Sequence, residues 1–316
     1  MNKIHIFSLG INSYGGKKIL EFIIRKYQDH ELILYADNRL IIDKNFKNIK
    51  LKKYKNNFYN HNHLYLKLKK FKNDKILFLN GLPPFYSFKD YNAVVFFQNK
   101  NIYDIEFSFK NIFNKDLIKK IYFNCFKKNV SNWCTFNLYT SDILQKLLNT
   151  KSNINVLNFK PFIDFKINYE KKIYDFFYPA SSSKNKNHSF LLTSLIELSK
   201  IGYRPKIFLT LYEDEFEKLY PSHILKKYNL NIINKYIEND DTLYKIYSLS
   251  KNLIFPSTSE TLAIPLFEAE YFGLNIYLSD KINFFYTNKV NIYYFDTNNI
   301  RSLVNLIIDS KTNNNI

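Results

Sequence analysis

Short β-rich runs alternate with amphipathic segments along the chain, and this alternation constrains the fold more than any other feature. In the first half we expect strands at residues 4–9, 32–36, 75–79 and 93–97, and helices at 17–26, 117–126 and 141–148. In the second half we expect strands at 174–178, 205–210, 231–233, 253–255 and 275–278, and helices at 187–200, 214–228, 241–249 and 265–272. Successive βαβ units predict parallel sheets. Two such sets predict an α/β protein with two Rossmann-like domains.

The alternation breaks near residues 158–169, where Pro161 and scattered polar residues predict a linker. We therefore expect one domain over residues 1–160 and a second over residues 161–310. A length of 316 residues fits two domains of roughly 150 residues each.

The composition excludes several classes of protein. Apolar residues make up 46% and charged residues 23%, which excludes wholesale disorder, and the mean hydropathy of −0.31 fits a soluble chain. Cys125 and Cys134 are too few for a secreted disulfide framework. The apolar run at residues 4–7 is too short for a signal peptide, and no run approaches the ~20 apolar residues of a membrane span. We expect a cytoplasmic protein, bound to a membrane at most peripherally.

Residues 253–273, LIFPSTSETLAIPLFEAEYFG, form the most informative segment. They predict a buried strand, a loop of small polar residues and a helix with Pro265 in its first turn. Ligands of open α/β sheets bind beyond the carboxyl ends of strands, where helix N-termini present free N–H groups. Glu260 in the loop would hold a sugar beside a phosphate, and Glu268 in the helix would hold a ribose diol. The alternative is that Glu260 caps the helix and Glu268 is solvated.

Two further segments follow expected strands and open helices. Residues 177–188, FYPASSSKNKNH, are placed to hold a pyrophosphate, where a cation offsets the charge of a leaving diphosphate. Lys186 is the favoured cation and Lys184 competes with it, while His188 is either a phosphate partner or a helix-surface histidine. In residues 7–17, Gly15 and Gly16 begin a helix without the full Gly-x-Gly-x-x-Gly pattern, so a dinucleotide site is weakly supported.

Taken together, these three segments resemble the retaining glycosyltransferases of family 4, which have the GT-B fold and a Glu-x7-Glu motif. The resemblance implies that two Rossmann-like domains face a central cleft, with acceptor bound by the first and nucleotide sugar by the second. It implies catalytic roles for Glu260 and Lys186, with Glu268 on the nucleotide ribose. The other donor-binding residues that it implies are Gly15, Gly16, Asn187, Thr261, Leu262, Ala263 and Ile264.

The chain also departs from that family. Ala263 stands where members usually have Gly, and we interpret it as tightening the donor pocket. The His that many members carry in the first domain is missing, and neither Gln98 nor Asn99 is assigned its role. His61 and His63 have no metal-ligand partners at useful spacing. No Cys/His or carboxylate cluster predicts a metal site, as expected for GT-B enzymes, which normally need no bound divalent ion. No cofactor is expected, because the nucleotide sugar is a substrate.

The net charge of +18 is unevenly distributed. Residues 1–165 hold 28 Lys+Arg against 12 Asp+Glu, and residues 166–316 hold 18 against 16. A codon bias toward lysine would act on both halves, so the asymmetry requires a local explanation. Residues 50–72 combine aromatic residues with Leu64 and Leu68 at helical spacing. The lysines of this basic patch are Lys52, Lys53, Lys55, Lys67, Lys69 and Lys70.

Three interpretations of the basic patch are open. It suits an anionic membrane surface, it could bind nucleic acid through phosphates, or it belongs to an ordinary helix with a solvated face. Since the first domain of GT-B enzymes binds the acceptor, which is often lipid-linked, we favour a membrane or acceptor patch and expect no nucleic acid partner.

The sequence thus predicts a hexosyltransferase-type enzyme. It would move a sugar from a nucleotide-sugar donor to a saccharide acceptor, lipid-linked and at the inner face of the cytoplasmic membrane, with retention of configuration. The pathway would be bacterial surface polysaccharide synthesis, such as lipopolysaccharide O-antigen. A GT-B-fold nucleotide-sugar epimerase and a non-enzymatic basic protein that binds membrane or nucleic acid are the alternatives.

Overall fold

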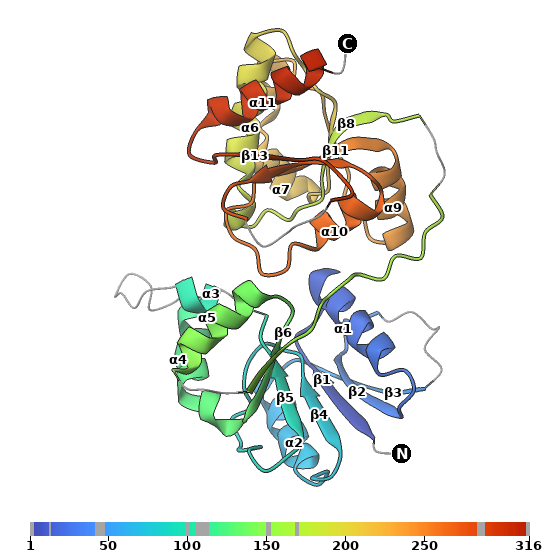
Figure 1. The fold of residues 1–316 in the computed structure, drawn as a ribbon, viewed down its shortest axis with the longest axis vertical. Helices are drawn as coiled ribbons and strands as arrows, with labels where there is room; N and C mark the ends of the chain where they lie inside the picture. The colour runs from blue at the N-terminus through green and yellow to red at the C-terminus, as the bar shows by residue number, and fades with distance from the viewer. Residues whose placement is uncertain are drawn as a thin grey trace. The chain divides into compact units, whose positions relative to one another are not determined.

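The computed structural model describes residues 3–12, 14–41, 48–98, 101–104, 114–149, 153–167, 171–282 and 288–313. The chain divides into two compact units, Met1–Phe162 and Ile163–Ile316. Each unit contains one sheet, and all strand pairings described are parallel (Figure 1).

The first unit is built on a seven-stranded sheet in the order β3-β2-β1-β4-β5-β6-β7. Its strands are β1 (Ile4–Ser8), β2 (Leu32–Asp37), β3 (Ile49–Tyr54), β4 (Lys75–Phe78), β5 (Ala93–Phe96), β6 (Asn132–Thr135) and β7 (Asn153–Val156). Its helices are α1 (Tyr14–Lys26), α2 (Phe58–Leu68), α3 (Asn101–Asp104), α4 (Lys115–Phe126), the 3-10 turn η2 (Lys127–Asn129) and α5 (Leu138–Leu148). Side chains of α2, α4 and α5 share one apolar cluster with the central strands.

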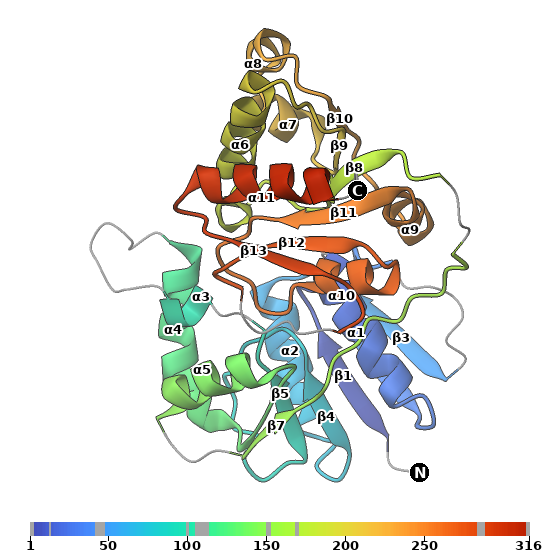
Figure 2. The ribbon, with the colours of Figure 1, turned by 45° about the horizontal axis from the view of Figure 1, so that its top comes forward.

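The second unit has a six-stranded sheet in the order β10-β9-β8-β11-β12-β13. Its strands are β8 (Tyr174–Tyr178), β9 (Ile207–Leu209), β10 (Ile232–Asn234), β11 (Ser250–Phe255), β12 (Asn275–Ser279) and β13 (Ile292–Phe295). Its helices are η3 (Lys184–Lys186), α6 (His188–Lys200), α7 (Glu213–Leu219), α8 (Ser222–Lys227), α9 (Asp240–Ser248), α10 (Ile264–Tyr271) and α11 (Ile300–Asn313). Helices α10 and α11 lie on opposite sides of β12 and β13 (Figure 2).

Both sheets have the doubly wound strand order, in which the chain starts in the middle, runs to one edge and then returns to continue in the other direction. The expected pair of Rossmann-like α/β domains is therefore confirmed. The direction reverses between β1 and β4 in the first unit and between β8 and β11 in the second. Ligands of such sheets bind at these reversal points, beyond the carboxyl ends of the strands.

Some elements differ from the sequence-based expectation. Residues 214–228 were expected to form one helix, but α7 and α8 are separate because Pro221, which lacks an N–H, directly precedes α8. Residues 49–54 of the basic segment form the edge strand β3 rather than part of a helix. Strands β6, β7 and β13 were not expected, because their four-residue segments lack a long apolar run.

Aromatic side chains pack closely together in part of the core of the second unit. Tyr247 of α9 lies edge-on to Phe177 of β8 with 4.8 Å between ring centroids, and it stacks on Phe272 at 5.4 Å. All three side chains are buried. This packing fixes α9 against the sheet directly behind the reversal point.

Across the described ranges, no helix is both long and apolar enough to cross a bilayer.

Candidate active site

The loop after β8 is shaped by a tight reversal before α6. Residues 184–186 form the turn η3, and Asn187 adopts the left-handed conformation with φ of 57°. Asn tolerates this region better than most residues, so the chain can turn directly into α6 at His188. Lys184 is exposed, whereas the Lys186 side chain is only 19% exposed. The loop thus turns Lys186 toward the protein.

Asn185 joins this loop to the loop that follows β11. Its side-chain amide donates to the carbonyl of Ser259 at 2.8 Å, and its own carbonyl accepts from the N–H of Thr258 at 2.8 Å. The carboxyl ends of β8 and β11 are neighbours in the sheet, so these bonds tie together the two loops on either side of the reversal point. The geometry between them is therefore fixed.

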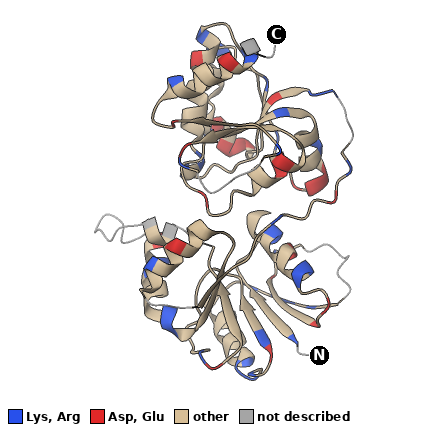
Figure 3. Cartoon of the chain, viewed as in Figure 1, with Lys and Arg blue, Asp and Glu red and all other residues tan. Residues whose placement is uncertain are grey.

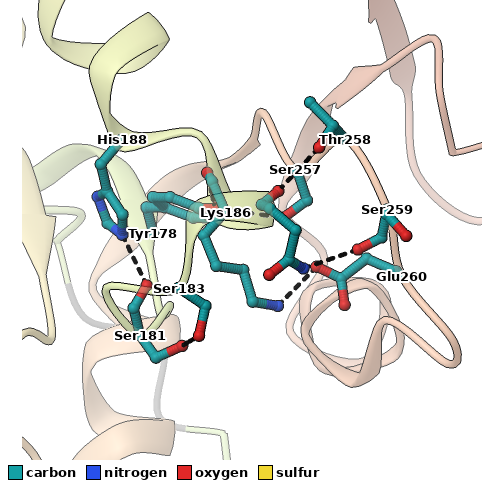
Figure 4. A network of polar contacts seen from close by, with 10 residues as sticks. Tyr178, Ser181, Ser183, Lys186, His188, Ser257, Thr258, Ser259 and Glu260 are labelled. Carbon is teal, nitrogen blue, oxygen red and sulfur yellow. Dashed lines mark hydrogen bonds and ion pairs between the residues drawn. The ribbon is translucent and has the colours of Figure 1, made fainter. Parts of the chain in front are cut away.

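Lys186 and Glu260, the two expected catalytic residues, meet across these loops. Lys186 Nζ lies 2.6 Å from Glu260 Oε1, and the carboxylate side chain is 11% exposed (Figure 4). A charge-assisted bond of this length in a partly desolvated place is stronger than an exposed pair. The pair presents a cation and a carboxylate side by side at the reversal point.

Two buried hydroxyls and a histidine hold the loop that carries Lys186. Tyr178 donates to the carbonyl of Lys186 at 2.6 Å, and its hydroxyl lies 3.3 Å from Ser257 Oγ. Burial raises the pKa of Tyr178 well above its usual value, so the hydroxyl stays protonated as a donor. His188 contacts the carbonyl of Ser181 through Nε2 and the hydroxyl of Tyr220 through Nδ1, both at 2.9 Å.

His188 is therefore not a helix-surface histidine. It is 3% exposed, and burial lowers its pKa, which favours the neutral ring. The neutral ring donates from Nε2 to the Ser181 carbonyl and accepts at Nδ1 from Tyr220. Since both nitrogens are engaged within the loop, His188 positions the loop rather than meeting a phosphate directly.

Glu268 lies in α10 with its side chain fully buried. Its Oε2 accepts a hydrogen bond from the hydroxyl of Tyr247 at 2.8 Å. The alternative expectation, a helix cap at Glu260 and a solvated Glu268, is wrong on both points. The N-cap of α10 is Ala263, which forms no side-chain cap bond, and Glu268 is shielded from solvent.

The start of α10 offers backbone rather than side chains to a ligand. The side chains of Leu262, Ala263 and Ile264 are all buried, and Thr261 is half-buried. Ala263 has φ of 48°, a left-handed conformation that costs an L-residue roughly 1–2 kcal/mol. Glycine avoids this cost, which explains in physical terms why a glycine suits the position. What this stretch can present is the positive end of α10 and its free N–H groups.

In the first unit, Gly15 and Gly16 lie in the first turn of α1, after the carboxyl end of β1. Gln98 is half-buried and donates to the carbonyl of Leu79 at 3.0 Å. Asn99 lies outside the described residues. The amide of Gln98 is thus used within the fold.

An ion pair between Asp37 and Arg39, which the sequence did not reveal, lies at the carboxyl end of β2. Asp37 is fully buried and accepts from Arg39 Nε at 2.9 Å and Arg39 Nη2 at 2.8 Å. It also accepts from the N–H of Gly10 at 3.3 Å. The hydrogen bonds from Arg39 hold the pKa of Asp37 at about 2. In the sequence, an Asp followed two residues later by an Arg looks like an ordinary surface turn. Only the burial of Asp37 at the end of β2 identifies the two residues as a structural ion pair.

The structure divides the basic patch into separate places. Lys52 of β3 and Lys67 of α2 each lie near the ring of Tyr35, with Nζ atoms 5.9 and 5.8 Å from its centroid. Lys69 instead lies over Tyr86 at 5.6 Å. Leu64 and Leu68 are buried on the inner face of α2, as their spacing predicts. Lys52 and Lys53 lie in β3, Lys67 lies in α2, and the other three lysines follow these elements, so the patch is not one continuous amphipathic helix.

The sequence also failed to reveal three other residues that support the candidate site. Asn185, Tyr178 and Tyr247 act through contacts between residues far apart in the sequence, and no local pattern marks them. Among the side chains that the structure describes, no group of three or more His, Cys, Asp or Glu residues is arranged to hold a metal ion.

Two doubly wound domains with a cation and a carboxylate at the reversal point of the second define an α/β protein of the GT-B type. Residues 159–315, just under half of the chain, match the family model described as glycosyl transferases group 1. The second unit therefore matches a glycosyltransferase group 1 domain. No curated protein sequence matches this chain.

Similar solved structures confirm the fold. WaaG, described as a glycosyltransferase involved in lipopolysaccharide biosynthesis, has a TM-score of 0.70 and 13% identity, covering 98% of this chain and 91% of that one. Anabaena Alr3699/HepE, solved with UDP-glucose, has a TM-score of 0.69 and 13% identity, covering 100% and 91%. WaaB, a lipopolysaccharide outer core galactosyltransferase, has a TM-score of 0.63 and 13% identity, covering 97% and 89%.

Proposed function

We propose that this protein is a retaining glycosyltransferase of family 4 that uses a nucleotide-sugar donor. The observation that carries the proposal is the Lys186–Glu260 pair, held at 2.6 Å between the loops that follow β8 and β11. A cation beside a carboxylate at this place suits a donor whose diphosphate leaves and whose sugar reacts. A structural relative solved with UDP-glucose supports the same donor class.

In this proposal the charge of the leaving diphosphate is compensated by the chain's own groups. Lys186 supplies a positive charge, and the N-termini of α6 and α10 supply N–H groups. Transfer would therefore need no divalent ion. Glu260 orients the donor sugar, and Glu268 binds the ribose diol. The departing phosphate accepts the acceptor's proton on the face from which it leaves, which retains the anomeric configuration.

A thermal-shift screen with UDP, GDP, ADP, CDP and TDP tests the donor class. At about 100 times its Kd, one ligand stabilises the folded state by about 2.7 kcal/mol, which corresponds to several degrees of unfolding temperature. We expect at least one nucleoside diphosphate to produce this shift, with EDTA present. If none of the five does so at millimolar concentration, the proposal is wrong. Product analysis with the matching nucleotide sugar then separates transfer from epimerisation.

We further propose that the acceptor is a lipid-linked saccharide of bacterial surface polysaccharide synthesis, such as O-antigen, and that the first unit meets an anionic membrane. Exposed aromatic side chains support this: Phe58 and Tyr59, in the first turn of α2, are 78% and 74% exposed. Lys52, Lys53 and Lys55 are exposed beside them in sequence. Aromatic and basic residues together favour the interface of an anionic bilayer.

Vesicle binding tests the membrane contact. Each lysine near an anionic surface contributes about 1 kcal/mol, so exchanging Lys52, Lys53 and Lys55 for Gln should weaken binding to phosphatidylglycerol-containing vesicles on the order of 100-fold at low salt. The matched control exchanges three lysines of α7 and α8, namely Lys218, Lys226 and Lys227, and should bind nearly as wild type. Equal binding by both triple variants would contradict the membrane contact, and Lys52 and Lys53 would then serve only to protect the exposed edge strand β3 from pairing with another chain.

A further inference from the structure

The guanidinium of Arg39 is held in one orientation at the carboxyl end of β2. Its Nε and Nη2 atoms donate to the two carboxylate oxygens of Asp37 at 2.9 and 2.8 Å. Asp37 is fully buried, whereas the Arg39 side chain is 57% exposed. The buried carboxylate is therefore a fixed anchor, and the cation that it holds reaches solvent.

A guanidinium held in this way keeps a second binding edge. Arginine has five N–H groups in one plane, and Asp37 accepts from the edge formed by Nε and Nη2. The edge formed by Nη1 and Nη2 is directed away from Asp37, and it also carries two parallel N–H groups. Such a pair matches two oxygens of a phosphate or a carboxylate. Arg39 thus offers an anion a bidentate partner whose orientation is already set.

The turn that carries Arg39 is firmly built into the fold. The N–H of Arg39 donates to Asp37 Oδ1 at 3.0 Å, and the N–H of Leu40, a buried residue, donates to the Asp37 carbonyl at 3.0 Å. The N–H of Asn38 donates to the carbonyl of Tyr54 at 2.9 Å, which joins the turn to the end of β3. A cation on such a turn loses little conformational freedom when it binds a ligand, which favours affinity.

Arg39 lies at the edge of the first sheet where ligands of doubly wound folds bind. Strands β2 and β1 are neighbours, and the N–H of Gly10, in the turn after β1, donates to Asp37 Oδ2 at 3.3 Å. Gly10 has φ of 88°, and a Cβ there would lie 3.3 Å from Nδ2 of Asn56 in the turn after β3. The turns after β1, β2 and β3 therefore approach one another closely, beside the reversal point between β1 and β4.

The charge at this edge is positive. In the first unit, Lys and Arg residues outnumber Asp and Glu residues (Figure 3). At the amino end of the sheet, Glu31 pairs with Lys50 at 2.7 Å. At the carboxyl end, the described residues of the turns after β1, β2 and β3 include the exposed Arg39 and Lys55, and no carboxylate besides Asp37 lies at these three strand ends. A phosphate monoester, with a charge of about −1.5 to −2 at pH 7, suits this surplus better than a carboxylate.

The choice of arginine at this position supports a bidentate site. Only four of the 46 Lys and Arg residues of the chain are Arg. A lysine could neutralise Asp37, but its ammonium is a point charge on a flexible stem and has no second planar pair of N–H groups. The planar group at position 39 is thus what a bidentate anion site requires.

We propose that Arg39 binds a phosphate group of the saccharide acceptor through the Nη1–Nη2 edge of its guanidinium. The inference rests on the proposed function for the identity of the ligand, and it adds a phosphate ester to the chemistry of the acceptor. A phospholipid headgroup carries the same group, but a bilayer presents diffuse charge that flexible lysines meet equally well. A fixed planar fork instead suits a single phosphate.

A phosphorus NMR titration tests the assignment, with glucose 1-phosphate and inorganic phosphate as probes. The parent protein is Lys186→Met/Glu260→Gln, which lacks the cation of the second unit, so that a phosphate held by Lys186 does not contribute. We expect the parent to bind both probes in the millimolar range. Arg39→Lys keeps a positive charge beside Asp37 but lacks the second N–H pair, and it should weaken the binding of both probes by about tenfold or more.

Two further variants separate binding from folding. Arg301→Lys is the matched control, because Arg301 is exposed in the first turn of α11 in the second unit and its exchange should leave both affinities unchanged. Asp37→Asn/Arg39→Gln removes both charges of the ion pair, so no buried carboxylate is left without its cation. This variant should fold stably and lose affinity for the probes to at least the same extent as Arg39→Lys.

The outcomes separate this inference from the function on which it rests. If the parent binds neither probe at millimolar concentration, or if Arg39→Lys binds them as tightly as the parent, Arg39 is not a phosphate site. If Arg39→Lys loses affinity for phosphatidylglycerol vesicles but not for glucose 1-phosphate, the anion is a headgroup and the proposal is wrong. Failure of the nucleotide screen instead contradicts the proposed function, and with it only the identity of the ligand as an acceptor.

Discussion

Replacement of Lys186 by Met should lower the rate of sugar transfer by roughly 100- to 1,000-fold, the usual loss when one preorganised group that stabilises developing charge is removed. Met has similar length and no charge, so the change removes the cation at the loop after β8 and little volume. Steady-state kinetics with the donor found by thermal shift would measure the loss, which should lie mainly in kcat. Lys184→Met is the matched control, because this exposed lysine lies in the same turn and should retain nearly full activity.

A structural effect of Lys186→Met must be separated from a catalytic one. The single variant leaves the carboxylate of Glu260 without its cation in a place that is 11% exposed, which destabilises the loop. The double variant Lys186→Met/Glu260→Gln removes both charges and should regain the unfolding temperature of the wild type while remaining inactive. If Lys186→Met alone transfers sugar within threefold of the wild-type rate, the assigned role is wrong.

Replacement of Glu268 should have two effects that different substitutions resolve. Glu268→Ala removes the acceptor of the Tyr247 hydroxyl in a fully buried place and leaves a cavity. We expect the free energy of unfolding to fall by about 2–4 kcal/mol. For a unit of this size the unfolding temperature would then drop by roughly 5–15 °C, which differential scanning calorimetry measures directly.

Glu268→Gln is the informative partner of that variant. Its amide oxygen still accepts from Tyr247, so the unfolding temperature should change little. Loss of the negative charge should weaken the bond to a ribose diol, and nucleoside diphosphate affinity should fall about 10- to 100-fold. Glu270→Gln, two residues later in α10 and partly exposed, is the control. If Glu268→Gln binds the nucleoside diphosphate as tightly as the wild type, Glu268 has only a structural role.

Sequence reasoning succeeded where chemistry and local pattern coincide. The strand–loop–helix around Glu260 was readable because a buried apolar run, small polar residues and Pro265 follow one another directly. The structure brings Lys186 to Glu260, which is 74 positions later in the sequence, because strands β8 and β11 are neighbours in the sheet. Periodicity likewise predicted the buried face of α2.

What escaped prediction depends on contacts rather than on pattern. Strand β3 reads as a lysine-rich surface segment, and only its pairing with β2 makes it a strand. The burial of His188 could not be inferred, because the hydroxyl of Tyr220 comes from another element. Arg39 is an ordinary basic residue of a lysine-rich chain until the buried Asp37 fixes its guanidinium.

The two hydrogen bonds between Asn185 and the loop after β11 have a mechanical consequence. Because Asn185 joins both loops, a displacement of one loop displaces the other, and the two loops behave as one rigid body. A substrate therefore meets a receptor whose shape is set before it arrives. Insertions or deletions in either loop would be transmitted to its neighbour, so the lengths of the two loops must change together or not at all.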